Sequence, residues 1–366
     1  MPDKIRVGIV GATVTTGGSG WGANAHVPAL NALPDYTLKA VCTSREETAQ
    51  ASKEKFGAEL AFHDINDMAA HPEIDLIAVS VRVPWHYDLV MAGLRANKPV
   101  FCEWPLGANL KEAQEMAGLA KERSLNTIVG LQGRSDPTWM YARDLIADGY
   151  VGEVLTANMS VMSGAVVERG GGRVWQRERK NGANTLTISG GHSIDAMCYV
   201  LGEFAEVQAR AVTRIKEWKD TDLNQMVPVD SPDAVTVAGV LATGAEVAFQ
   251  VAAVPHNPSG TRLEIYGREG SLVITSGSAN IGPNALYGAR GKDSPAEMQP
   301  PDAYRLAPEG TPAGPPRNVA QAYARYADTV ATGQASVPDF NDAVVRHRLI
   351  DAIERSSAEG RAISLK

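Results

Sequence analysis

The sequence of 366 residues has few cysteines, no excess of positive charge and no long apolar run. Its three cysteines, Cys42, Cys102 and Cys198, are far apart and form no CxxC pair. This scarcity argues against a disulfide framework or a metal site of the zinc type and indicates a reducing compartment. Lys and Arg total 35 against 42 for Asp and Glu, so the net charge of -7 disfavours nucleic acid as a partner.

The sequence also lacks the features of export and of membrane insertion. No apolar run approaches the roughly 20 residues that a membrane-spanning helix needs. The first residues lead directly into a strand-like run at 5–10, without the apolar core of a signal peptide. We therefore expect a cytoplasmic protein with no membrane partner. The chain length suits two domains, and its 44% hydrophobic and 21% charged residues are typical of a globular protein.

The first third of the sequence alternates short apolar runs with helical patterns. The apolar runs lie at 5–10, 38–43, 74–81, 99–104 and 126–132, and the clearest helical patterns at 86–96 and 110–123. Apolar runs alternating with helices predict a doubly wound parallel sheet, covered on both faces. We expect this α/β domain to span 1–130 and to bind its ligand at the carboxyl ends of the strands.

After about residue 130 the pattern becomes that of an α+β domain. Pairs of alternating strands around short turns lie at 235–252 and 262–275, and helical patterns at 137–148, 190–201, 318–332 and 341–357. The stretch 276–316 is rich in Gly, Pro, Ala and Ser, which predicts a long surface loop. A second domain, 131–366, is therefore expected to contain a large, open, mostly antiparallel sheet.

A glycine-rich segment follows the first predicted strand. It reads Gly11-Ala-Thr13-Val14-Thr-Thr-Gly17-Gly18-Ser-Gly20-Trp21-Gly22. A strand, a glycine-rich turn and a helix together can bind a pyrophosphate, because small residues let the backbone amides approach the phosphates. Thr13 stands where GxGxxG has its second glycine, so a glycine-rich surface loop is the alternative.

Short motifs follow one another in a fixed order along the chain. They are Val7-Gly8-Ile9-Val10-Gly11, His26-Val27-Pro28, Val83-Pro84-Trp85-His86, Cys102-Glu103-Trp104-Pro105, Leu131-Gln132-Gly133-Arg134, Gly191-His192-Ser193-Ile194-Asp195 and Tyr266-Gly267-Arg268-Glu269-Gly270. In their order and spacing the chain resembles the glucose–fructose oxidoreductase / inositol dehydrogenase / rhizopine-catabolism (Gfo/Idh/MocA) family. The resemblance implies a Rossmann domain for a nicotinamide dinucleotide, followed by a sheet domain that holds a sugar or polyol. It also implies a homodimer or homotetramer.

The resemblance implies NAD as the cofactor and leaves NADP open. Many dinucleotide folds place an acid after the second strand to bond the ribose of NAD, whereas here Arg45 is available to a 2′-phosphate. The residues predicted to bind the cofactor are Gly11, Thr13, Val14, Trp21, Ser44, Arg45, Val81, His86, Glu103, Trp104 and Gln132.

Two positions depart from the family pattern. The family's Glu-Lys-Pro has Trp104 in place of the lysine, and the aspartate expected four residues before His192 is Ile188. Relatives with similar substitutions include a galactose-pathway regulator that binds dinucleotide without turning it over. The departures therefore keep a non-catalytic role open.

His192 is the predicted catalytic base. With an unperturbed pKa near 6.5, an imidazole can accept an alcohol proton as hydride departs. A histidine that caps a helix or packs in the core is the alternative. Asp195, three residues later, can orient the ring or contact substrate. Lys180 and Tyr141 are the further catalytic candidates.

Five cations fall within twelve residues of this acidic chain. They are Arg169, Arg173, Arg177, Arg179 and Lys180. Guanidinium and ammonium groups suit a carboxylate, sulfonate or phosphate, so the segment predicts an anionic sugar, and a solvated loop or subunit contact is the alternative. The predicted substrate-binding residues are Arg134, Arg173, Arg177, Lys180, His192 and Asp195.

Three functions follow from these observations. The first is an NAD(P)-dependent dehydrogenase that takes hydride from a ring carbon, C3, of an anionic sugar. The second is a redox-neutral, NAD-dependent glycosidase, in which transient C3 oxidation permits elimination, hydration and re-reduction of a sulfonated or carboxylated glycoside. The third is a sensor that binds dinucleotide and sugar and catalyses nothing.

Overall fold

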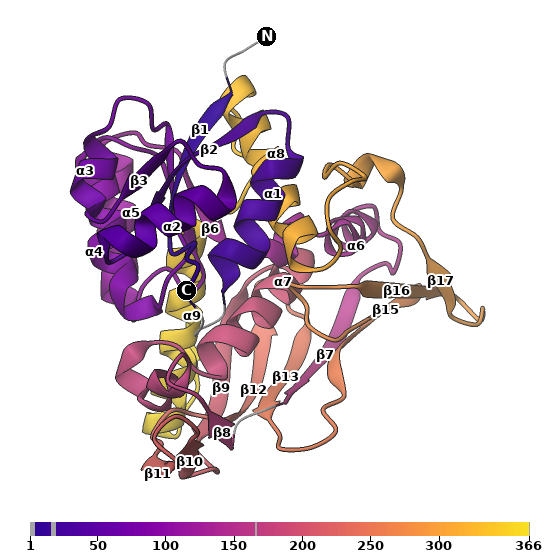
Figure 1. Cartoon of the computed structure of the whole chain (residues 1–366). Coiled ribbons are helices and arrows are strands. Elements are labelled where there is room, and N and C mark those ends of the chain that lie inside the picture. The colour runs from indigo at the N-terminus through magenta and orange to yellow at the C-terminus, as the bar shows by residue number, and fades with distance from the viewer. Residues whose placement is uncertain (1–3, 16–19, 165–166, 366) are drawn as a thin grey trace. The chain divides into compact units, whose positions relative to one another are not determined.

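The computed structural model describes residues 4–15, 20–164 and 167–365 (Figure 1). The chain forms two compact units. Unit 1 comprises residues 1–130 and 306–345, and unit 2 comprises residues 131–305 and 346–366. The predicted division into 1–130 and 131–366 therefore differs from these units at residues 306–345, which belong to unit 1.

Unit 1 is built on a six-stranded parallel sheet in the order β3-β2-β1-β4-β5-β6. Its strands are β1 (Ile5–Val10), β2 (Tyr36–Cys42), β3 (Leu60–Phe62), β4 (Leu76–Val79), β5 (Val100–Glu103) and β6 (Thr127–Gly130). All residues of β4 and β6 are buried, as expected for strands covered on both faces. The predicted doubly wound fold is confirmed, and β3 is the strand that the sequence analysis did not identify.

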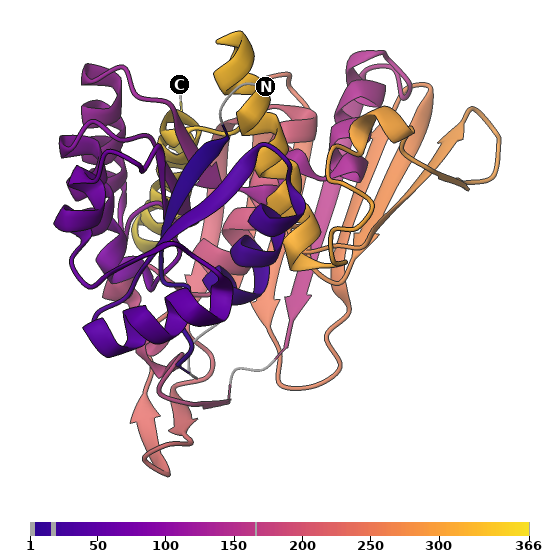
Figure 2. The same ribbon diagram turned by 45° about the horizontal axis from the view of Figure 1, so that its top comes forward.

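Helices cover both faces of this sheet (Figure 2). They are η1 (Gly22–His26, a π-helical turn), α1 (Val27–Ala32), α2 (Glu46–Phe56), α3 (Ile65–Ala70), η2 (Val83–Trp85, a 3₁₀ turn), α4 (His86–Arg95), α5 (Leu110–Glu122) and α8 (Pro315–Thr332). Helix α8 packs on η1 and α1 through a buried stripe that includes Val319, Tyr323 and Tyr326. Apolar residues at this three- to four-residue spacing explain why the returning segment belongs to unit 1.

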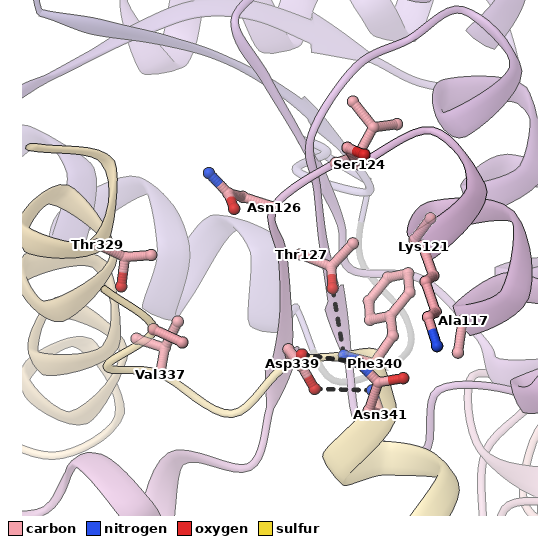
Figure 3. Close-up of a pocket in the computed structure, with 13 residues that line it drawn as sticks. Ala117, Lys121, Ser124, Asn126, Thr127, Thr329, Val337, Asp339, Phe340 and Asn341 are labelled. Carbon is pink, nitrogen blue, oxygen red and sulfur yellow. Dashed lines mark hydrogen bonds between the residues drawn. The ribbon is translucent and has the colours of Figure 1, made fainter. Parts of the chain in front are cut away.

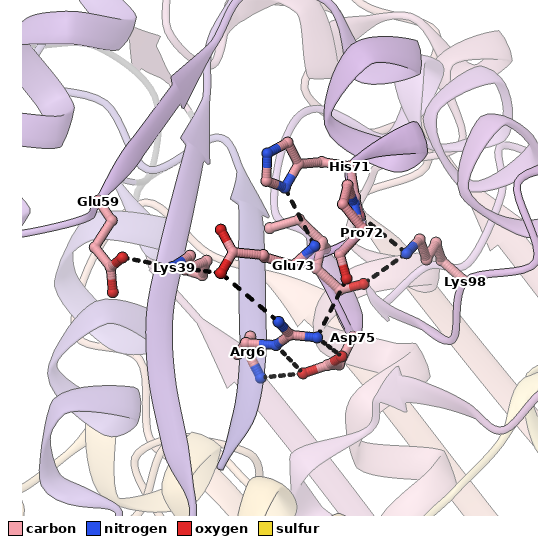
Figure 4. Close-up of polar contacts among 9 residues, drawn as sticks. Arg6, Lys39, Glu59, His71, Pro72, Glu73, Asp75 and Lys98 are labelled. Carbon is pink, nitrogen blue, oxygen red and sulfur yellow. Dashed lines mark hydrogen bonds and ion pairs between the residues drawn. The ribbon is translucent and has the colours of Figure 1, made fainter. Parts of the chain in front are cut away.

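Ion pairs close the amino edge of the same sheet (Figure 4). Arg6 of β1 donates from Nε and Nη2 to Asp75, at 2.8 and 2.7 Å, immediately before β4 begins. Lys39 of β2 lies between the carboxylates of Glu59 and Glu73. The hydrogen bond from Arg6 holds the pKa of Asp75 below its usual value. The amino edge is therefore occupied by structural charges.

Unit 2 contains a nine-stranded sheet in the order β17-β16-β15-β14-β7-β13-β12-β9-β18. Its strands are β7 (Val154–Ser163), β9 (Phe204–Val212), β12 (Ala234–Leu241), β13 (Glu246–Ala253), β14 (Gly260–Gly267), β15 (Gly270–Ser276), β16 (Asn284–Arg290), β17 (Ala296–Met298) and β18 (Ile363–Ser364). Of its pairs only β7 with β13 is parallel, so the predicted mostly antiparallel sheet is confirmed. Along β13, Val247, Phe249 and Val251 are buried while Ala248 and Gln250 are exposed, which gives the sheet one covered and one open face.

The remaining elements of unit 2 are helices and a small sheet. The helical segments are η3 (Gln132–Ser135), α6 (Pro137–Ala147), η4 (Val174–Arg177), η5 (Arg179–Asn181), η6 (Leu186–Gly190), α7 (Gly191–Leu201), η7 (Asp302–Tyr304) and α9 (Phe340–Glu359), which begins in unit 1. The small sheet joins β8 (Glu168–Arg169), β10 (Glu217–Asp220) and β11 (Gln225–Pro228). The prediction of one surface loop over 276–316 is wrong, because this stretch contains β16 and β17, whose small residues still alternate around the buried Leu286.

Candidate active site

Two glycines of the turn after β1 stand where there is no room for a side chain. Gly11 has φ of +100°, and a Cβ there would lie 2.1 Å from the carbonyl oxygen of Ser80. A Cβ on Gly22, at the start of η1, would lie 2.9 Å from the amide nitrogen of Ala12. Only glycine permits such close backbone approach, which is the property a pyrophosphate cradle requires.

The described part of this loop is held by hydroxyl groups. The amide of Val14 donates to Oγ of the buried Ser52 on α2 at 3.1 Å, and the hydroxyls of Thr13 and Thr15 lie 2.9 Å apart. Trp21 is half-buried immediately before η1. Gly17 and Gly18 of the glycine-rich segment lie outside the described residues.

The end of β2 presents the other predicted cofactor residues. Ser44 and Arg45 are exposed, and Arg45 precedes the first residue of α2. The hydroxyls of Thr43 and Thr48 both donate to the carbonyl oxygen of Arg45 at 2.9 Å, which fixes the backbone of this turn. An exposed hydroxyl and an exposed guanidinium are groups that suit a ribose hydroxyl or a 2′-phosphate.

His86 joins the loops that follow β4 and β5. Its Nδ1 lies 2.8 Å from the carbonyl oxygen of Pro105 and its Nε2 lies 3.2 Å from that of Val81. Burial lowers the pKa of His86, although both carbonyl contacts favour the protonated ring. Trp104, which replaces the family's lysine, is buried and precedes Pro105 through a cis peptide bond.

His26 is a fully buried link that the sequence analysis did not assign to a partner. Its Nε2 lies 2.8 Å from Oε1 of Glu103, so this nitrogen donates, and its Nδ1 accepts from the hydroxyl of Tyr323 at 2.9 Å. Gly130 lies beside the carboxylate of Glu103, where a Cβ would be 2.5 Å from Oε2. The predicted cofactor residue Glu103 is thus fixed by η1, α8 and β6 together.

In unit 2, His192 lies in the first turn of α7 and is 7% exposed. Asp195, one turn later, accepts from Nε and Nη2 of Arg134 at 2.9 and 2.8 Å and from Nε of Arg346 at 3.1 Å. Burial alone would raise the pKa of Asp195, but the two guanidinium groups outweigh it and hold the pKa below its usual value. The carboxylate therefore pairs with Arg134 and Arg346, and its part in orienting the His192 ring or contacting substrate stays a prediction.

The segment η3 is packed directly on α7. A Cβ on Gly133 would lie 3.2 Å from Cβ of Ala196, and the guanidinium of Arg134 also lies 5.8 Å from the ring of Tyr199. Gln132, the predicted cofactor residue at the start of η3, is buried. Arg134 therefore braces α7, and its role in binding substrate stays a prediction.

Arg346 is the residue of this cluster that the sequence analysis missed. It is fully buried, and its Nη1 and Nη2 donate to Sγ of Cys198 at 3.3 Å and to Glu203 at 2.8 Å. A signal existed, because Arg346 lies in register with Ala343 and Ile350 on the buried stripe of α9. A charged residue on such a stripe requires a buried partner.

Three of the five cations of this segment form ion pairs with neighbouring acids. Lys180 is 79% exposed and pairs with Glu178 at 2.8 Å, and Arg177 pairs with the same side chain at 2.8 Å. Arg179 pairs with Glu354 of α9. These contacts do not support a role for Lys180 as a base or for Arg177 in binding an anion.

Arg169 and Arg173 complete that segment. The guanidinium of Arg169 lies 4.5 Å from the ring of the buried Trp218, and burial together with the charge of Arg173 lowers the pKa of Arg169 to about 10. Arg173 is exposed, and among the described residues no carboxylate pairs with it. The remaining candidate, Tyr141, is half-buried with its ring centroid 5.7 Å from that of Tyr304.

A cavity of about 300 Å³ lies elsewhere in unit 1, at the amino end of β6 (Figure 3). It is bordered by α5, by the start of α9 and by Thr127, whose hydroxyl accepts from the amide of Phe340 at 3.2 Å. None of the predicted site residues lines it. Across residues 4–15, 20–164 and 167–365, no cluster of three or more His, Cys, Asp or Glu is arranged to hold a metal. Within those ranges no helix has the length and apolarity to cross a membrane.

A parallel sheet with a turn after β1 in which Gly11 and Gly22 leave no space for a Cβ, followed by a unit with a large antiparallel sheet, is the architecture of the two-domain dinucleotide-binding class. The sequence model described as "Oxidoreductase family, NAD-binding Rossmann fold" matches residues 5–131, and that described as "Gal80p, C-terminal domain" matches residues 137–276. The chain belongs to the Gfo/Idh/MocA oxidoreductase family and has a Gal80p-like C-terminal domain.

Three relatives illustrate the range of this family. The dehydrogenase AclE of Aspergillus oryzae is 30% identical over 381 positions that cover 100% of both chains. Levoglucosan dehydrogenase of Pseudarthrobacter phenanthrenivorans is 24% identical over 74% of this chain and 73% of its own. The crystal structure of a super-repressor mutant of Gal80p from Saccharomyces cerevisiae matches with a TM-score of 0.88, at 25% identity over 99% of both chains.

Proposed function

We propose that this protein is an NAD(P)-dependent dehydrogenase that takes hydride from a ring carbon of a sugar or polyol. The observation that carries the proposal is His192, an imidazole in the first turn of a braced helix, in a chain of this family. The dehydrogenases among its relatives, one of which is named for levoglucosan, support the substrate class. NAD is the proposed cofactor, and the exposed Arg45 makes NADP the alternative to test.

The residues present fit a dinucleotide. The turn at Gly11 and Gly22 would hold the pyrophosphate with backbone amides, and Ser44 and Arg45 would contact the adenosine ribose. The bound nicotinamide supplies the hydride acceptor. The imidazole of His192 accepts the proton of the reacting hydroxyl group, which raises the electron density that drives hydride away from the carbon.

The test is a screen of neutral and acidic sugars and polyols with NAD and NADP, in which formation of reduced cofactor is followed. For a substrate so found, His192→Ala should lower kcat by about 10²- to 10⁴-fold. The affinity for NADH, measured by fluorescence titration, should change by less than about twofold, because the predicted contacts to pyrophosphate and ribose at Gly11, Gly22 and Arg45 are left intact. If His192→Ala keeps full turnover, the imidazole is not the base.

We further propose C3 of an anionic sugar as the reacting position, with Arg173 as its charge partner. Arg173 is the one cation of the predicted set that is exposed and pairs with no carboxylate among the described residues. Arg173→Ala should raise KM about tenfold for acidic sugars, the loss of about one charge-assisted hydrogen bond, and leave neutral sugars unchanged. Lys180→Ala is the control, since Lys180 is paired with Glu178. An equal rise in KM for acidic and neutral sugars would contradict the proposed recognition of charge by Arg173.

A sensor of dinucleotide and sugar is the second candidate. It is favoured by Trp104 and Ile188 at the positions of the family's lysine and aspartate, and by the likeness to Gal80p, a regulatory protein. Tight NADH binding without turnover across the whole panel would select this candidate. The redox-neutral glycosidase is not favoured, because its second base would be the paired Lys180 or Tyr141 beside Tyr304.

We also infer a homodimer or homotetramer that pairs through the open face of the nine-stranded sheet. The exposed residues of β13 include Ala248 and Gln250, small or uncharged side chains that a flat partner can cover. Size-exclusion chromatography with light scattering measures the mass, and Ala248→Arg should shift it to that of a monomer. A monomeric wild-type protein would contradict the inference.

A further inference from the structure

We propose that Arg346 is a positioning residue. It holds the first turn of α7, which carries His192, in place relative to η3, which carries Gln132. It acts through the carboxylate of Asp195 and the guanidinium of Arg134. The inference rests on the proposed role of His192, but its test needs no substrate.

The first link consists of the hydrogen bonds that the guanidinium of Arg346 donates. Its side chain is fully buried, and its three nitrogens each have an acceptor, on Asp195, Cys198 and Glu203. Asp195 and Cys198 are three residues apart on α7, and Glu203 follows the end of that helix. A planar guanidinium with three anchored donors cannot rotate or shift without breaking several hydrogen bonds. Arg346 therefore links α9 to two positions within α7 and to Glu203 just beyond the end of that helix.

The second link joins α7 to the segment that follows β6. Asp195 accepts two parallel hydrogen bonds from Arg134, and Gly133 packs on Ala196 of the same helix. Arg134 stands two residues after Gln132 within η3. His192 stands one turn before Asp195 on α7. A displacement of the Asp195 carboxylate would therefore change the position of His192 relative to Gln132.

The charges of the cluster balance. Asp195 and Glu203 face Arg134 and Arg346, so two negative charges meet two positive ones. Burial disfavours the charged form of Arg346, yet the sulfur of Cys198 and the two carboxylates hold its pKa above the usual value. Without Arg346, Asp195 would still be paired with Arg134, and the partly exposed Glu203 would be solvated. Loss of Arg346 should therefore displace the carboxylate without leaving an isolated buried charge.

The experiment compares wild type, Arg346→Met and Arg346→Lys, each labelled with ¹⁵N-histidine, by two-dimensional NMR of the ring resonances at one pH. His192→Gln assigns the His192 signals. Arg346→Met should shift and broaden the His192 signals while those of His26 and His86 in unit 1 stay in place. Arg346→Lys should restore part of the wild-type position, because an ammonium can bond Asp195 but cannot fork to Glu203.

Arg179→Ala is the matched control. Arg179 also pairs with a residue of α9, Glu354, but on the surface, so its loss should leave the ring signals of His192 unchanged. Affinity for NADH should change by less than about twofold in Arg179→Ala, since Arg179 is not one of the predicted cofactor residues.

An unshifted His192 signal in folded Arg346→Met would overturn the proposal. So would an equal shift in Arg179→Ala, because the effect would then be a general response of α9. If Arg346→Met does not fold, Asp195→Asn weakens the same link from its other end and should displace the same signal. Absence of turnover in the sugar screen would refute the proposed dehydrogenase and leave this result intact.

Discussion

Tyr323→Phe tests whether the returning segment is fastened to the cofactor edge of unit 1. The hydroxyl of Tyr323 donates to Nδ1 of His26 at 2.9 Å, and the other ring nitrogen of His26 is held by Glu103 at 2.8 Å. Both rings are fully buried, so the substitution leaves Nδ1 with no donor and no access to solvent. An unsatisfied buried acceptor costs about 1–3 kcal/mol, and we expect about 2 kcal/mol of lost stability.

A loss of that size should lower Tm by roughly 4–8 °C for a unit of this length. Urea unfolding, followed by circular dichroism, gives the free energy directly, with an unchanged m value if only stability is affected. Tyr326→Phe is the control, because Tyr326 is buried on the same helix and, among the described residues, its hydroxyl has no hydrogen-bond partner. Equal stability of wild type and Tyr323→Phe would refute the reasoning, and equal losses in the two variants would show that the hydrogen bond is not the cause.

Two further substitutions test other parts of unit 1. Gly11→Ala should abolish measurable NADH binding or prevent folding, because its Cβ would lie 2.1 Å from the Ser80 carbonyl oxygen. Fluorescence titration measures the binding and circular dichroism measures the folding. Normal NADH binding by this variant would contradict the proposed pyrophosphate site. Asp75 has a folded-state pKa below the unfolded value of 3.8, so its contribution is present above about pH 4 and is lost as pH falls through the folded value. Asp75→Asn should therefore reduce the loss of unfolding free energy at acid pH, by about 1 kcal/mol or less for this partly exposed pair. Urea unfolding at a series of pH values measures this free energy. An unchanged loss at acid pH would contradict this assignment.

Much of the fold could be predicted because periodicity and burial agree. The alternation around Phe249 predicts a strand with one covered face, and the structure has that strand in β13. The strand β3 has only three residues, which is too short for a pattern. Strand β16 could not be recognised from the sequence, because its Gly, Ala and Asn residues give almost no alternation of apolar and polar side chains. Its large buried apolar residue is Leu286.

The candidate site could be predicted where a residue acts through its own chemistry. The glycine turn at Gly11 and the imidazole at His192 could be identified in this way. Partners could not, because Asp195 meets Arg346 across a separation of 151 positions and no local pattern encodes that pairing. For the same reason the charges of Arg177 and Lys180 predicted a pocket, whereas Glu178 between them forms ion pairs with both.

The hydrogen bond between His26 and Tyr323 spans 297 positions, and it has a consequence for biosynthesis. A ribosome releases the amino-terminal sheet long before it has translated α8, so the nascent sheet exposes the apolar surface that α8 will cover. Unit 1 cannot reach its final state until residues 306–345 have emerged from the ribosome. A fragment that stops at residue 130 should consequently aggregate or recruit a chaperone, and supplying 306–345 as a separate peptide should rescue it.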